Sequence, residues 1–357
     1  MDDLLAHLRE KRDLNREQIE RAIGLLIAEG AVEPKAAFLQ GLREKGETAE
    51  EISAFVRALL RHAIDPGIQA ASLPGPMIDI CGTGGDRMEL FNISTTSMFI
   101  LAAGGAVVVK HGNRAITSSC GGADVLEELG VRIDLPPEEL RRCVETLGLG
   151  FVFAPAYHPA FKAIAPVRKQ LAERGIPTIF NMLGPLLNPA QPKFQLVGIF
   201  SPALLPKYAA AMGMLGRERA WAVHGHGTDE LSTTGVNEVL EVTPEGVARL
   251  AIDPEELGLA RARVEDLKGG DRGANAQMLT GILDGSDHGP RRDIVLLNAA
   301  AGFVITGLAT DLSAGLARAR QQIQSGAALA KLRAMQEWGS RPGDGAHVRS
   351  GQSCSPR

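Results

Sequence analysis

The chain has 357 residues, of which 45% are hydrophobic and 22% are charged, a composition typical of a soluble globular protein of about two domains. Its 42 acidic and 38 basic residues give a net charge of −4, which argues against binding nucleic acid through an overall positive charge. No run reaches the roughly 18 apolar residues of a membrane span, no secretory signal opens the chain, and four scattered cysteines indicate neither a disulfide framework nor a zinc site. We expect a reduced protein of the cytoplasm that binds neither nucleic acid nor membrane.

Residues 1–70 carry a helical pattern. Asn15 with Gln18, and Thr48 with Glu51, have the spacing of capping boxes at helix starts. The second box precedes an apolar stripe on one helix face, made of Ile52, Phe55, Val56, Leu59 and Leu60. This part of the sequence predicts a small helical layer that packs on a larger body.

From residue 77 onward, short apolar runs alternate with helical periods and Gly-rich turns. Strands are expected at residues 77–81, 106–109, 151–153, 194–199 and 220–223. Helices are expected at residues 94–103, 124–129, 137–147 and 204–215. This alternation is typical of an α/β domain with a mainly parallel sheet.

Later segments depart from that alternation. Residues 159–188 read as a helix followed by a Pro- and Gly-rich stretch, which we expect to return to the helical layer. Residues 239–250 indicate a hairpin, and residues 293–335 indicate a long helical stretch that is broken near Gly307. Residues 339–357 are rich in Gly, Pro and Ser, which predicts a disordered tail.

A Gly-rich turn, Gly82-Thr83-Gly84-Gly85-Asp86, follows the first expected strand, and Asn92-Ile93-Ser94-Thr95 stands where the next helix begins. Glycines allow the backbone to approach an anion closely, and a helix start with hydroxyl side chains suits a phosphate. Tight turns and ordinary caps have the same appearance, so a purely structural role stays open for both segments.

Lys110-His111-Gly112-Asn113-Arg114 follows the next strand, at the strand end where open α/β sheets bind ligands. Lysine and arginine at that position suit the charges of phosphate groups. The small residues between Thr117 and Ala123 leave room for a ligand. A solvated loop is the structural alternative, and His111 by itself fits an ordinary hydrogen-bonding role.

Asp229 and Glu230 lie in a Gly-rich loop after the strand expected at residues 220–223. Adjacent carboxylates can hold Mg²⁺, which prefers hard oxygen ligands and usually shares its shell with substrate phosphates. An acidic surface turn is the alternative. His224 and His226 have no third ligand at a zinc-like spacing, which disfavours a zinc site.

His158-Pro159, Pro166-Val167-Arg168 and the stretch from Asn181 to Pro185 form the last candidate group. Arginine can hold a carboxylate through two parallel hydrogen bonds, which makes Arg168 a candidate for binding an acidic substrate. By spacing alone, Arg168 reads equally as a surface residue of a helix.

Taken in order, these motifs resemble the anthranilate phosphoribosyltransferase family of tryptophan biosynthesis. The segments that carry the resemblance, within residues 10–335, are GTGGD, NIST, KHGNR, GADVLEELG, HPA, PVRK, TIFNMLGPLLNP, HG and DELS. The resemblance implies an α/β fold like that of nucleoside phosphorylases and phosphoribosyltransferases, with a small helical domain and a larger α/β domain around a mainly parallel central sheet. The helical domain would comprise residues 1–70 with 160–190, and the α/β domain, which binds the phosphoribosyl donor, residues 71–159 with 191–336. A homodimer formed through the helical part is also implied.

The same resemblance implies Mg²⁺-dependent transfer of a phosphoribosyl group from 5-phosphoribosyl 1-diphosphate to the amine of anthranilate. Residues that match the donor side are Gly82, Gly85, Asp86, Asn92, Ser94, Thr95, Lys110, Asn113 and Ser118. Residues that match the magnesium ligands are Ser94, Asp229 and Glu230. Residues that match the anthranilate side are Gly82, His111, Asn113, His158, Arg168 and Pro185. Arg168 would face the carboxylate, and Arg168, Asn113 and His111 are the candidates for catalysis.

The sequence departs from the family pattern at Leu90, Gly122 and Pro177, which replace a Thr, a Ser and an Arg. The first two changes remove hydroxyl groups that touch the donor in the family. Each loss weakens donor binding by about 1 kcal/mol where nothing compensates. Three alternatives therefore stay open: a phosphoribosyltransferase with another aromatic acceptor, a metal-independent enzyme like pyrimidine nucleoside phosphorylase, and a partner-binding protein without activity. Asp229 and Glu230 argue against the last two.

Overall fold

The computed structural model describes residues 1–86, 88–115 and 119–340. The chain begins with four helices, α1 (Asp2–Arg9), α2 (Arg16–Ile27), α3 (Val32–Lys45) and α4 (Ala49–Leu60). Both predicted capping boxes are confirmed, because the side chain of Asn15 accepts from the Gln18 N–H and that of Thr48 accepts from the Glu51 N–H. These caps satisfy backbone donors that the start of a helix leaves without partners.

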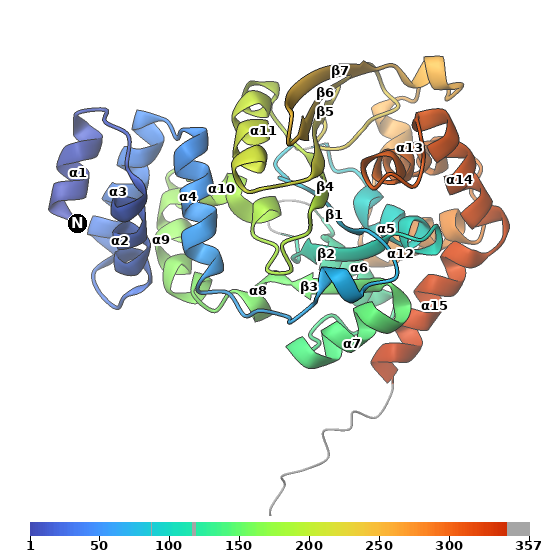
Figure 1. The fold of residues 1–357 in the computed structure, drawn as a ribbon, viewed down its shortest axis with the longest axis horizontal. Coiled ribbons are helices and arrows are strands. Elements are labelled where there is room, and N and C mark those ends of the chain that lie inside the picture. Colours follow the sequence, from blue (N-terminus) through green and yellow to red (C-terminus); the bar gives the residue numbers. More distant parts are fainter. Residues whose placement is uncertain (87, 116–118, 341–357) are drawn as a thin grey trace, which may run out of the picture.

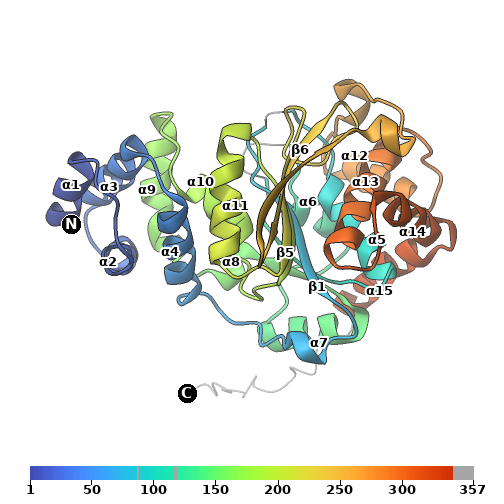
Figure 2. The same cartoon turned by 45° about the horizontal axis from the view of Figure 1, so that its top comes forward.

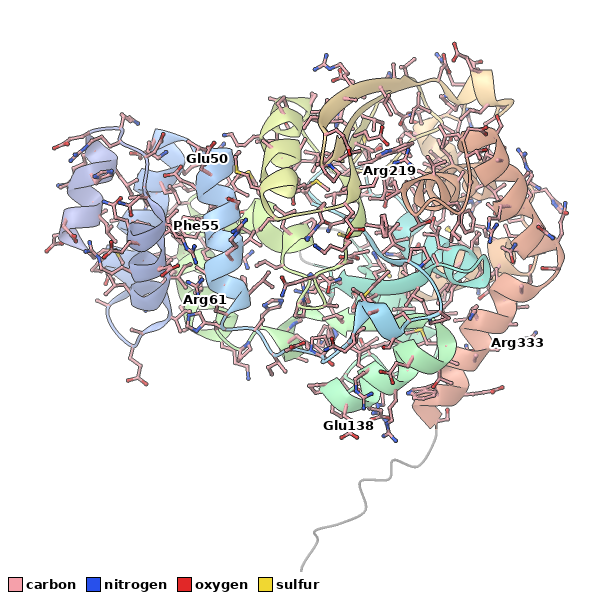
Figure 3. The ribbon with its side chains drawn as sticks, in the orientation of Figure 1. Glu50, Phe55, Arg61, Glu138, Arg219 and Arg333 are labelled. Carbon is pink, nitrogen blue, oxygen red and sulfur yellow. The ribbon has the colours of Figure 1, made fainter. Side chains whose placement is uncertain are left out.

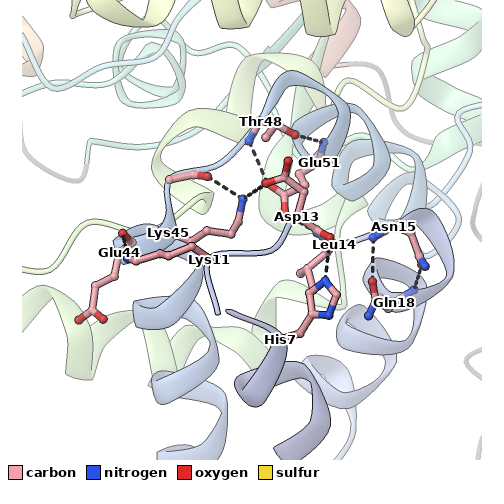
Figure 4. Close-up of polar contacts among 11 residues, drawn as sticks. His7, Lys11, Asp13, Leu14, Asn15, Gln18, Glu44, Lys45, Thr48 and Glu51 are labelled. Carbon is pink, nitrogen blue, oxygen red and sulfur yellow. Dashed lines mark hydrogen bonds and ion pairs between the residues drawn. The ribbon is translucent and has the colours of Figure 1, made fainter. Parts of the chain in front are cut away.

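Polar contacts join the loops between these helices (Figure 4). Lys45, at the end of α3, donates to Asp13 Oδ1 and to Glu51 Oε2, both at 2.7 Å, and its side chain is only 2% exposed. Glu51 also accepts from the Leu14 N–H at 2.9 Å. The lysine and the glutamate thus tie the loop between α1 and α2 to the loop between α3 and α4.

In the larger part of the described chain, seven strands form one sheet in the order β3-β2-β1-β4-β5-β6-β7. The first five strands in this order are parallel, and β6 and β7 add an antiparallel hairpin beside β5. The strands are β1 (Met77–Gly82), β2 (Val107–Gly112), β3 (Leu149–Phe153), β4 (Phe194–Gly198), β5 (Arg219–Gly225), β6 (Asn237–Thr243) and β7 (Gly246–Ile252). The predicted α/β fold with a mainly parallel sheet is confirmed.

Helices cover both faces of the sheet (Figure 1, Figure 2). The helices of this part are α5 (Ile93–Ala103), α6 (Gly122–Glu128), α7 (Pro137–Leu147), α8 (Ala154–Tyr157), α11 (Leu205–Met214), α12 (Arg272–Leu283), α13 (Pro290–Ile305), α14 (Leu312–Gln324) and α15 (Ala327–Ser340). α5 and α13 pack on one face, and α11 packs on the other, between the sheet and α4. A mainly parallel sheet is therefore buried on both sides, as its crossover helices require.

The segment after β3 leaves the sheet and returns to the helical layer, as expected for residues 159–188. α9 (Phe161–Glu173) packs against α2 and α3, and α10 (Phe180–Leu183) leads into the turn Gly184–Leu186. One apolar cluster contains residues of α2, α3, α4, α9 and α10 together with residues of β4, β5 and α11. The helical layer therefore shares its core with one face of the sheet.

At the amino end of β5, Arg219 lies beside α13 (Figure 3). It donates to Glu241 Oε1 of β6 and to the Val304 carbonyl of α13, both at 2.7 Å. Trp221 Nε1 donates to the same Glu241 oxygen at 3.0 Å. These contacts fix the amino end of β5 against β6 and α13.

The predicted tail begins too early. α15 continues through Ser340, because Trp338 near its end is 8% exposed and belongs to an apolar cluster with residues of α7. The remaining residues of the predicted tail, 341–357, lie outside the described residues. The long helical stretch is interrupted near Gly307, as predicted, and again between α14 and α15. None of the helices in the described ranges is both long and apolar enough to cross a lipid bilayer.

Candidate active site

Loops from the carboxyl ends of neighbouring strands meet at one edge of the sheet. The Gly84 N–H, after β1, donates to Asp229 Oδ2, after β5, at 2.6 Å. Thr83 is tied to β4 on the same side, because its N–H donates to the Gly198 carbonyl at 2.9 Å and its hydroxyl accepts from the Phe200 N–H at 3.1 Å. Open α/β sheets bind their ligands at this edge.

Glycines let the loop after β5 approach the sheet closely. A Cβ atom on Gly82 would collide with the Asp229 carboxylate, and a Cβ atom on Gly198 would collide with the Asp229 carbonyl. Gly84 and Gly85 have φ angles of 68° and 90°, in the left-handed region that favours glycine. The Gly-rich turn is therefore required by the fold at this edge, and Gly85 lies exposed on it.

Three carboxyl groups gather beside this turn. Burial raises the pKa of Asp229 to about 7, with the neighbouring Asp86 carboxylate as the next cause. Burial also raises the pKa of Glu230 to about 8, and Asp229 adds to that shift while Lys110 opposes it. Carboxylates held close together resist ionisation, and a cation bound beside Asp229 and Glu230 would relieve their repulsion.

Ser94 and Lys110 connect the acidic pair to the start of α5. The Ser94 backbone lies close enough to Glu230 to oppose the rise of the pKa of that carboxyl. Lys110 Nζ donates to Ser94 Oγ at 3.1 Å and to the Ile80 carbonyl at 2.5 Å, and the lysine is 4% exposed. Lys110 therefore lies behind Ser94, within the electrostatic reach of Glu230.

The oxygen atoms at this edge fit magnesium better than a softer metal. In residues 1–86, 88–115 and 119–340, no three His, Cys, Asp or Glu side chains are arranged to hold a metal ion by themselves. Asp229, Glu230 and the Ser94 hydroxyl would supply hard oxygen ligands for only part of a coordination shell. That incomplete set suits Mg²⁺, whose remaining positions are usually filled by water and substrate phosphates.

Asn92, at the cap of α5, is held in a fixed orientation. Its Nδ2 donates to the Cys120 carbonyl, and its Oδ1 accepts from Asn275 Nδ2 of α12, both at 3.0 Å. Asn275 is 2% exposed, and its Oδ1 accepts from the Gly270 N–H at 2.8 Å. Asn275 thus joins the loop before α12 to the loops before α5 and α6.

Leu90 and Gly122, which replace hydroxyl residues of the family pattern, have different surroundings. Leu90 pairs through its backbone with Lys268 and packs against the main apolar cluster. A Cβ atom on Gly122 would lie 2.9 Å from Thr95 Oγ1, so a side chain at position 122 would crowd the buried Thr95. Glycine at position 122 leaves the Thr95 hydroxyl undisturbed.

The loop after β2 is held at both ends by one carboxylate. Asp124 Oδ2, in the first turn of α6, accepts from the Ala115 N–H and the Gly121 N–H, both at 2.8 Å. Asn113 is exposed, and its Oδ1 accepts from the following N–H at 2.8 Å. The predicted donor-side residue Ser118 lies outside the described residues.

His111 faces a separate group of residues on the other side of β2. Its Nδ1 lies 3.1 Å from the Gly184 carbonyl, which can only accept, so we assign the ring proton to Nδ1. Its Nε2 is buried and has no hydrogen-bond partner within the described residues. Burial, together with the nearby His158, lowers the pKa of His111 to about 3. The ring is therefore neutral near pH 7, with the Nε2 lone pair available.

A row of rings runs from His111 to Arg168. The His111 and His158 centroids are 5.2 Å apart, His158 and Phe161 are 5.5 Å apart, and so are Phe161 and Phe180. The Arg168 Cζ lies 5.7 Å from the Phe180 centroid. Burial lowers the pKa of His158 to about 4, and its Nε2 also lacks a partner among the described residues. This row offers flat apolar walls, two acceptor nitrogens and one cation.

The predicted site residues therefore fall into two adjacent groups. The first, around the acidic pair, contains Gly82, Asp86, Ser94, Lys110, Asp229 and Glu230. The second contains His111, His158, Arg168 and, through the neighbouring Gly184 carbonyl, Pro185. No contact within the described residues joins the exposed Asn113 to Arg168.

Sequence reasoning missed several residues of this region. Phe161 and Phe180 link His158 to Arg168. Phe161 and Arg168 stand seven positions apart, which places them on one helix face, and this spacing was a usable signal. Asn275 and Asp124 lie in segments that resemble the family, but their orienting contacts could not be predicted, because the contact of Asn275 with Asn92 spans 183 positions and that of Asp124 with Ala115 depends on the path of the loop.

Comparisons with known proteins agree with this arrangement. A model described as "Glycosyl transferase family, helical bundle domain" matches residues 2–63, and one described as "Glycosyl transferase family, a/b domain" matches residues 74–329. The anthranilate phosphoribosyltransferase of Anaeromyxobacter dehalogenans is 46% identical over 331 residues, which cover 92% of this chain and 96% of the relative.

Solved structures of such enzymes have the same fold. That of Thermus thermophilus has a TM-score of 0.88 and 40% identity, and covers 95% of this chain and 100% of its own. That of Saccharomyces cerevisiae, solved in complex with PRPP and Mg, has a TM-score of 0.85 and 27% identity, and covers 95% of this chain and 98% of its own. The yeast enzyme was also solved with 4-fluoroanthranilate.

Proposed function

This chain belongs to the anthranilate phosphoribosyltransferase family, and from that premise we propose that it transfers the phosphoribosyl group of 5-phosphoribosyl 1-diphosphate to the amine of anthranilate in tryptophan biosynthesis. The observation that carries the proposal is one sheet edge at which the Gly82–Asp86 turn and the acidic pair adjoin the row of rings that ends at Arg168. The two substrate classes bound by the yeast enzyme support it.

The donor would bind between the Gly-rich turn, the start of α5 and the acidic pair. The residues we assign to it are Gly82, Gly85, Asp86, Asn92, Ser94, Thr95, Lys110, Asn113 and Ser118. Backbone N–H groups of the turn and of the helix start suit the phosphate oxygens. Mg²⁺, held by Asp229, Glu230 and the Ser94 hydroxyl, would neutralise charge on the departing diphosphate.

The acceptor would bind along the row of rings. Arg168 suits the anthranilate carboxylate, and the flat side chains of Phe161 and Phe180 suit the aromatic ring. The unpartnered Nε2 atoms of His111 and His158 suit the hydrogens of the amine, because neutral imidazole nitrogens accept hydrogen bonds. Gly82, Asn113 and Pro185 complete the assignment on this side.

The reaction forms a bond between the amine nitrogen and ribose C1 and breaks the bond from C1 to the diphosphate oxygen. An aromatic amine is a neutral nucleophile near pH 7, so the site needs no strong base before attack. Arg168, Asn113 and His111 would hold the amine in line with C1, and the transition state would gain from positioning and from fixed charges. Once the new bond forms, the nitrogen releases its extra proton.

The larger organisation belongs to the same proposal. We assign residues 1–70 with 160–190 to a helical domain and residues 71–159 with 191–336 to an α/β domain, so that the acceptor side would lie where they join. Family membership supports a homodimer through the helical domain, which sedimentation velocity would test. The biosynthetic role of the family supports action in the cytoplasm.

A direct assay tests the function. Purified protein is mixed with 5-phosphoribosyl 1-diphosphate, Mg²⁺ and anthranilate, and the loss of anthranilate fluorescence and the release of diphosphate are followed together. We expect equal amounts of both. Diphosphate release with another aromatic amine but not with anthranilate would favour a different acceptor, and phosphate-dependent cleavage of thymidine would favour a nucleoside phosphorylase.

Loss of the acidic pair should abolish turnover. In Asp229→Ala and Glu230→Ala we expect kcat/KM to fall by at least about a hundredfold, because the charge of the leaving group loses its counter-ion. The matched control is Glu238→Ala, which removes an exposed carboxylate of β6. Turnover like that of the wild type, with ordinary dependence on Mg²⁺, would remove Asp229 and Glu230 from the proposed metal site.

A further inference from the structure

A polar strip crosses the middle of an otherwise apolar sheet face. On the face toward the helical layer, residues of β2 belong to one apolar cluster, and residues of β4 and β5 belong to another. Asp79 of β1 and Gln195 of β4 lie between them, paired in register, and both are 0% exposed. Such burial costs stability unless every polar atom has a partner.

Asp79 holds two separate segments. Its Oδ1 accepts from the His111 N–H at 3.1 Å, and its Oδ2 accepts from Asn188 Nδ2 at 3.0 Å. The same Asn188 nitrogen donates to the Val109 carbonyl at 2.7 Å, and Asn188 Oδ1 accepts from the Ala190 N–H at 3.0 Å. One carboxylate thus connects β2 to the chain that follows α10.

Gln195 holds the same segment after α10, at Pro185, three residues before Asn188. Its Nε2 donates to the Pro185 carbonyl at 2.6 Å, and its Oε1 accepts from Arg217 Nε at 2.9 Å. The Tyr208 hydroxyl of α11 donates to the Met182 carbonyl at 2.6 Å. Buried side chains of the α/β part therefore hold residues 182–188 at several points.

The held chain in turn supports the two imidazoles of the acceptor side. The Nδ1 of His111 lies 3.1 Å from the Gly184 carbonyl, and the Leu187 backbone lies close enough to His158 to oppose the fall of its pKa. Gly184 directly precedes Pro185, which Gln195 holds, and Leu187 directly precedes Asn188, which Asp79 holds. Both rings keep a buried Nε2 without a partner in the described part of the chain, so a hydrogen-bonding position on each ring is unused by the protein.

We infer that Asp79 and Gln195 are positioning residues for the aromatic acceptor, which hold residues 184–188 and thereby the rings of His111 and His158. Well-packed apolar residues that replace buried polar groups often leave stability unchanged or increase it. Apolar residues at positions 79 and 195 would therefore stabilise the fold as well, so stability alone does not account for the polar pair. The inference rests on the proposed function, and it predicts that the strip affects acceptor binding far more than donor binding.

Two substitutions of unchanged shape test this inference. In Asp79→Asn, the NH₂ group of the amide replaces one of the two accepting oxygens. It then faces a donor, either the His111 N–H or the Asn188 NH₂ group, so one of the two hydrogen bonds is lost. Gln195→Glu loses the donor to the Pro185 carbonyl but keeps an acceptor for Arg217. In each variant we expect the KM for anthranilate to rise about tenfold, with the donor KM within about twofold of the wild type, since one lost buried hydrogen bond is worth about that much.

The matched control is Thr306→Val. Thr306 is 8% exposed, and its hydroxyl donates to the Gly302 carbonyl at 2.7 Å, at the end of α13 beside the amino end of β5. Both KM values should stay at the wild-type level in this variant. An unchanged anthranilate KM in the folded variants of the strip, or an equal rise of both KM values, would overturn the inference.

A second measurement separates this inference from the proposed function. Nitrogen NMR of the imidazole rings in the ligand-free protein should show His111 protonated at Nδ1 in the wild type and in Thr306→Val. A mixture of tautomers is expected in Asp79→Asn and Gln195→Glu, and an unchanged tautomer in both would overturn the inference even if anthranilate is not the acceptor. If Asp79→Asn fails to fold, Gln195→Glu alone decides.

Discussion

At the scale of single residues, Lys110 and His111 explain how the two groups of the site come to be adjacent. They are neighbours on β2, and successive side chains of a strand point to opposite faces. Lys110 contacts Ser94 at the start of α5, whereas His111 contacts the Gly184 carbonyl. One strand end thereby contributes to both groups, and reactants bound to them would lie close together, which is the main requirement of a reaction driven by positioning.

Burial of His158 predicts a pH dependence of stability. The pKa of His158 is lowered to about 4 from an ordinary value of 6.5, so below pH 6.5 the unfolded chain takes up a proton that the native protein refuses. The free energy of unfolding is therefore unaffected by His158 above pH 6.5. It decreases as the pH falls below 6.5, by about 2 kcal/mol at pH 5. Urea unfolding at pH 7.5 and pH 5 should show a smaller difference in His158→Gln than in the wild type. The exposed His62→Gln is the control, and a full difference in His158→Gln would contradict the prediction.

At the scale of elements, the helical layer depends on its loops as much as on its apolar stripes. α1 has 8 residues and α3 has 14, lengths at which isolated helices are barely stable in water. Capping boxes at α2 and α4 satisfy the helix starts, and Lys45 with Glu51 joins the loops between the helices (Figure 4). The layer is therefore held by a few buried polar contacts in addition to its core.

Removal of the Lys45 charge should destabilise this layer strongly. Lys45→Met leaves the fully buried Glu51 carboxylate without its cation, which costs about 3–5 kcal/mol when a buried pair loses one partner. The matched control is Lys11→Met, an exposed lysine whose Nζ contacts the Glu44 carbonyl, with an expected change within about 0.5 kcal/mol. Urea unfolding followed by circular dichroism measures both. Equal losses in the free energy of unfolding for the two substitutions would contradict a stabilising role of the buried Lys45–Glu51 pair.

At the scale of the whole molecule, the helical layer and the sheet share one apolar cluster. Phe55 of α4, labelled in Figure 3, belongs to the same cluster as Val197 of β4 and Ala222 of β5, and all three are 0% exposed. α11 stands between α4 and the sheet and packs on both. Since neither side keeps this core alone, we expect the two parts to unfold together.

Damage in the helical layer should therefore be felt in the sheet. Phe55→Ala removes a fully buried ring, at a cost of about 3–5 kcal/mol. Both tryptophans, Trp221 and Trp338, lie in the α/β part, so their fluorescence reports on that part alone. We expect their urea midpoint to fall together with that of circular dichroism. Val247→Ala, at a residue 52% exposed, is the control, and a fluorescence midpoint unchanged by Phe55→Ala would show independent unfolding.

Local sequence patterns were sufficient to predict most helices and strands and the turns that connect them. The capping boxes at Asn15 and Thr48, the strand at residues 77–81 and the Gly-rich turn after it depend on residues a few positions apart, so they could be predicted from the sequence. The candidate site could be predicted only from the order of its motifs along the chain, because each motif by itself was also compatible with a structural role.

Contacts between distant segments were decided by the tertiary structure alone. Asp79 and Gln195 are 116 positions apart, and they become neighbours only because β1, paired with β2 on one side, pairs with β4 on the other. The row from His158 through Phe161 and Phe180 to Arg168 likewise depends on how α9 and α10 turn back toward the helical layer. A sequence pattern records which face of an element is apolar, whereas the order of strands and the path of a crossing segment are set by packing of the whole chain.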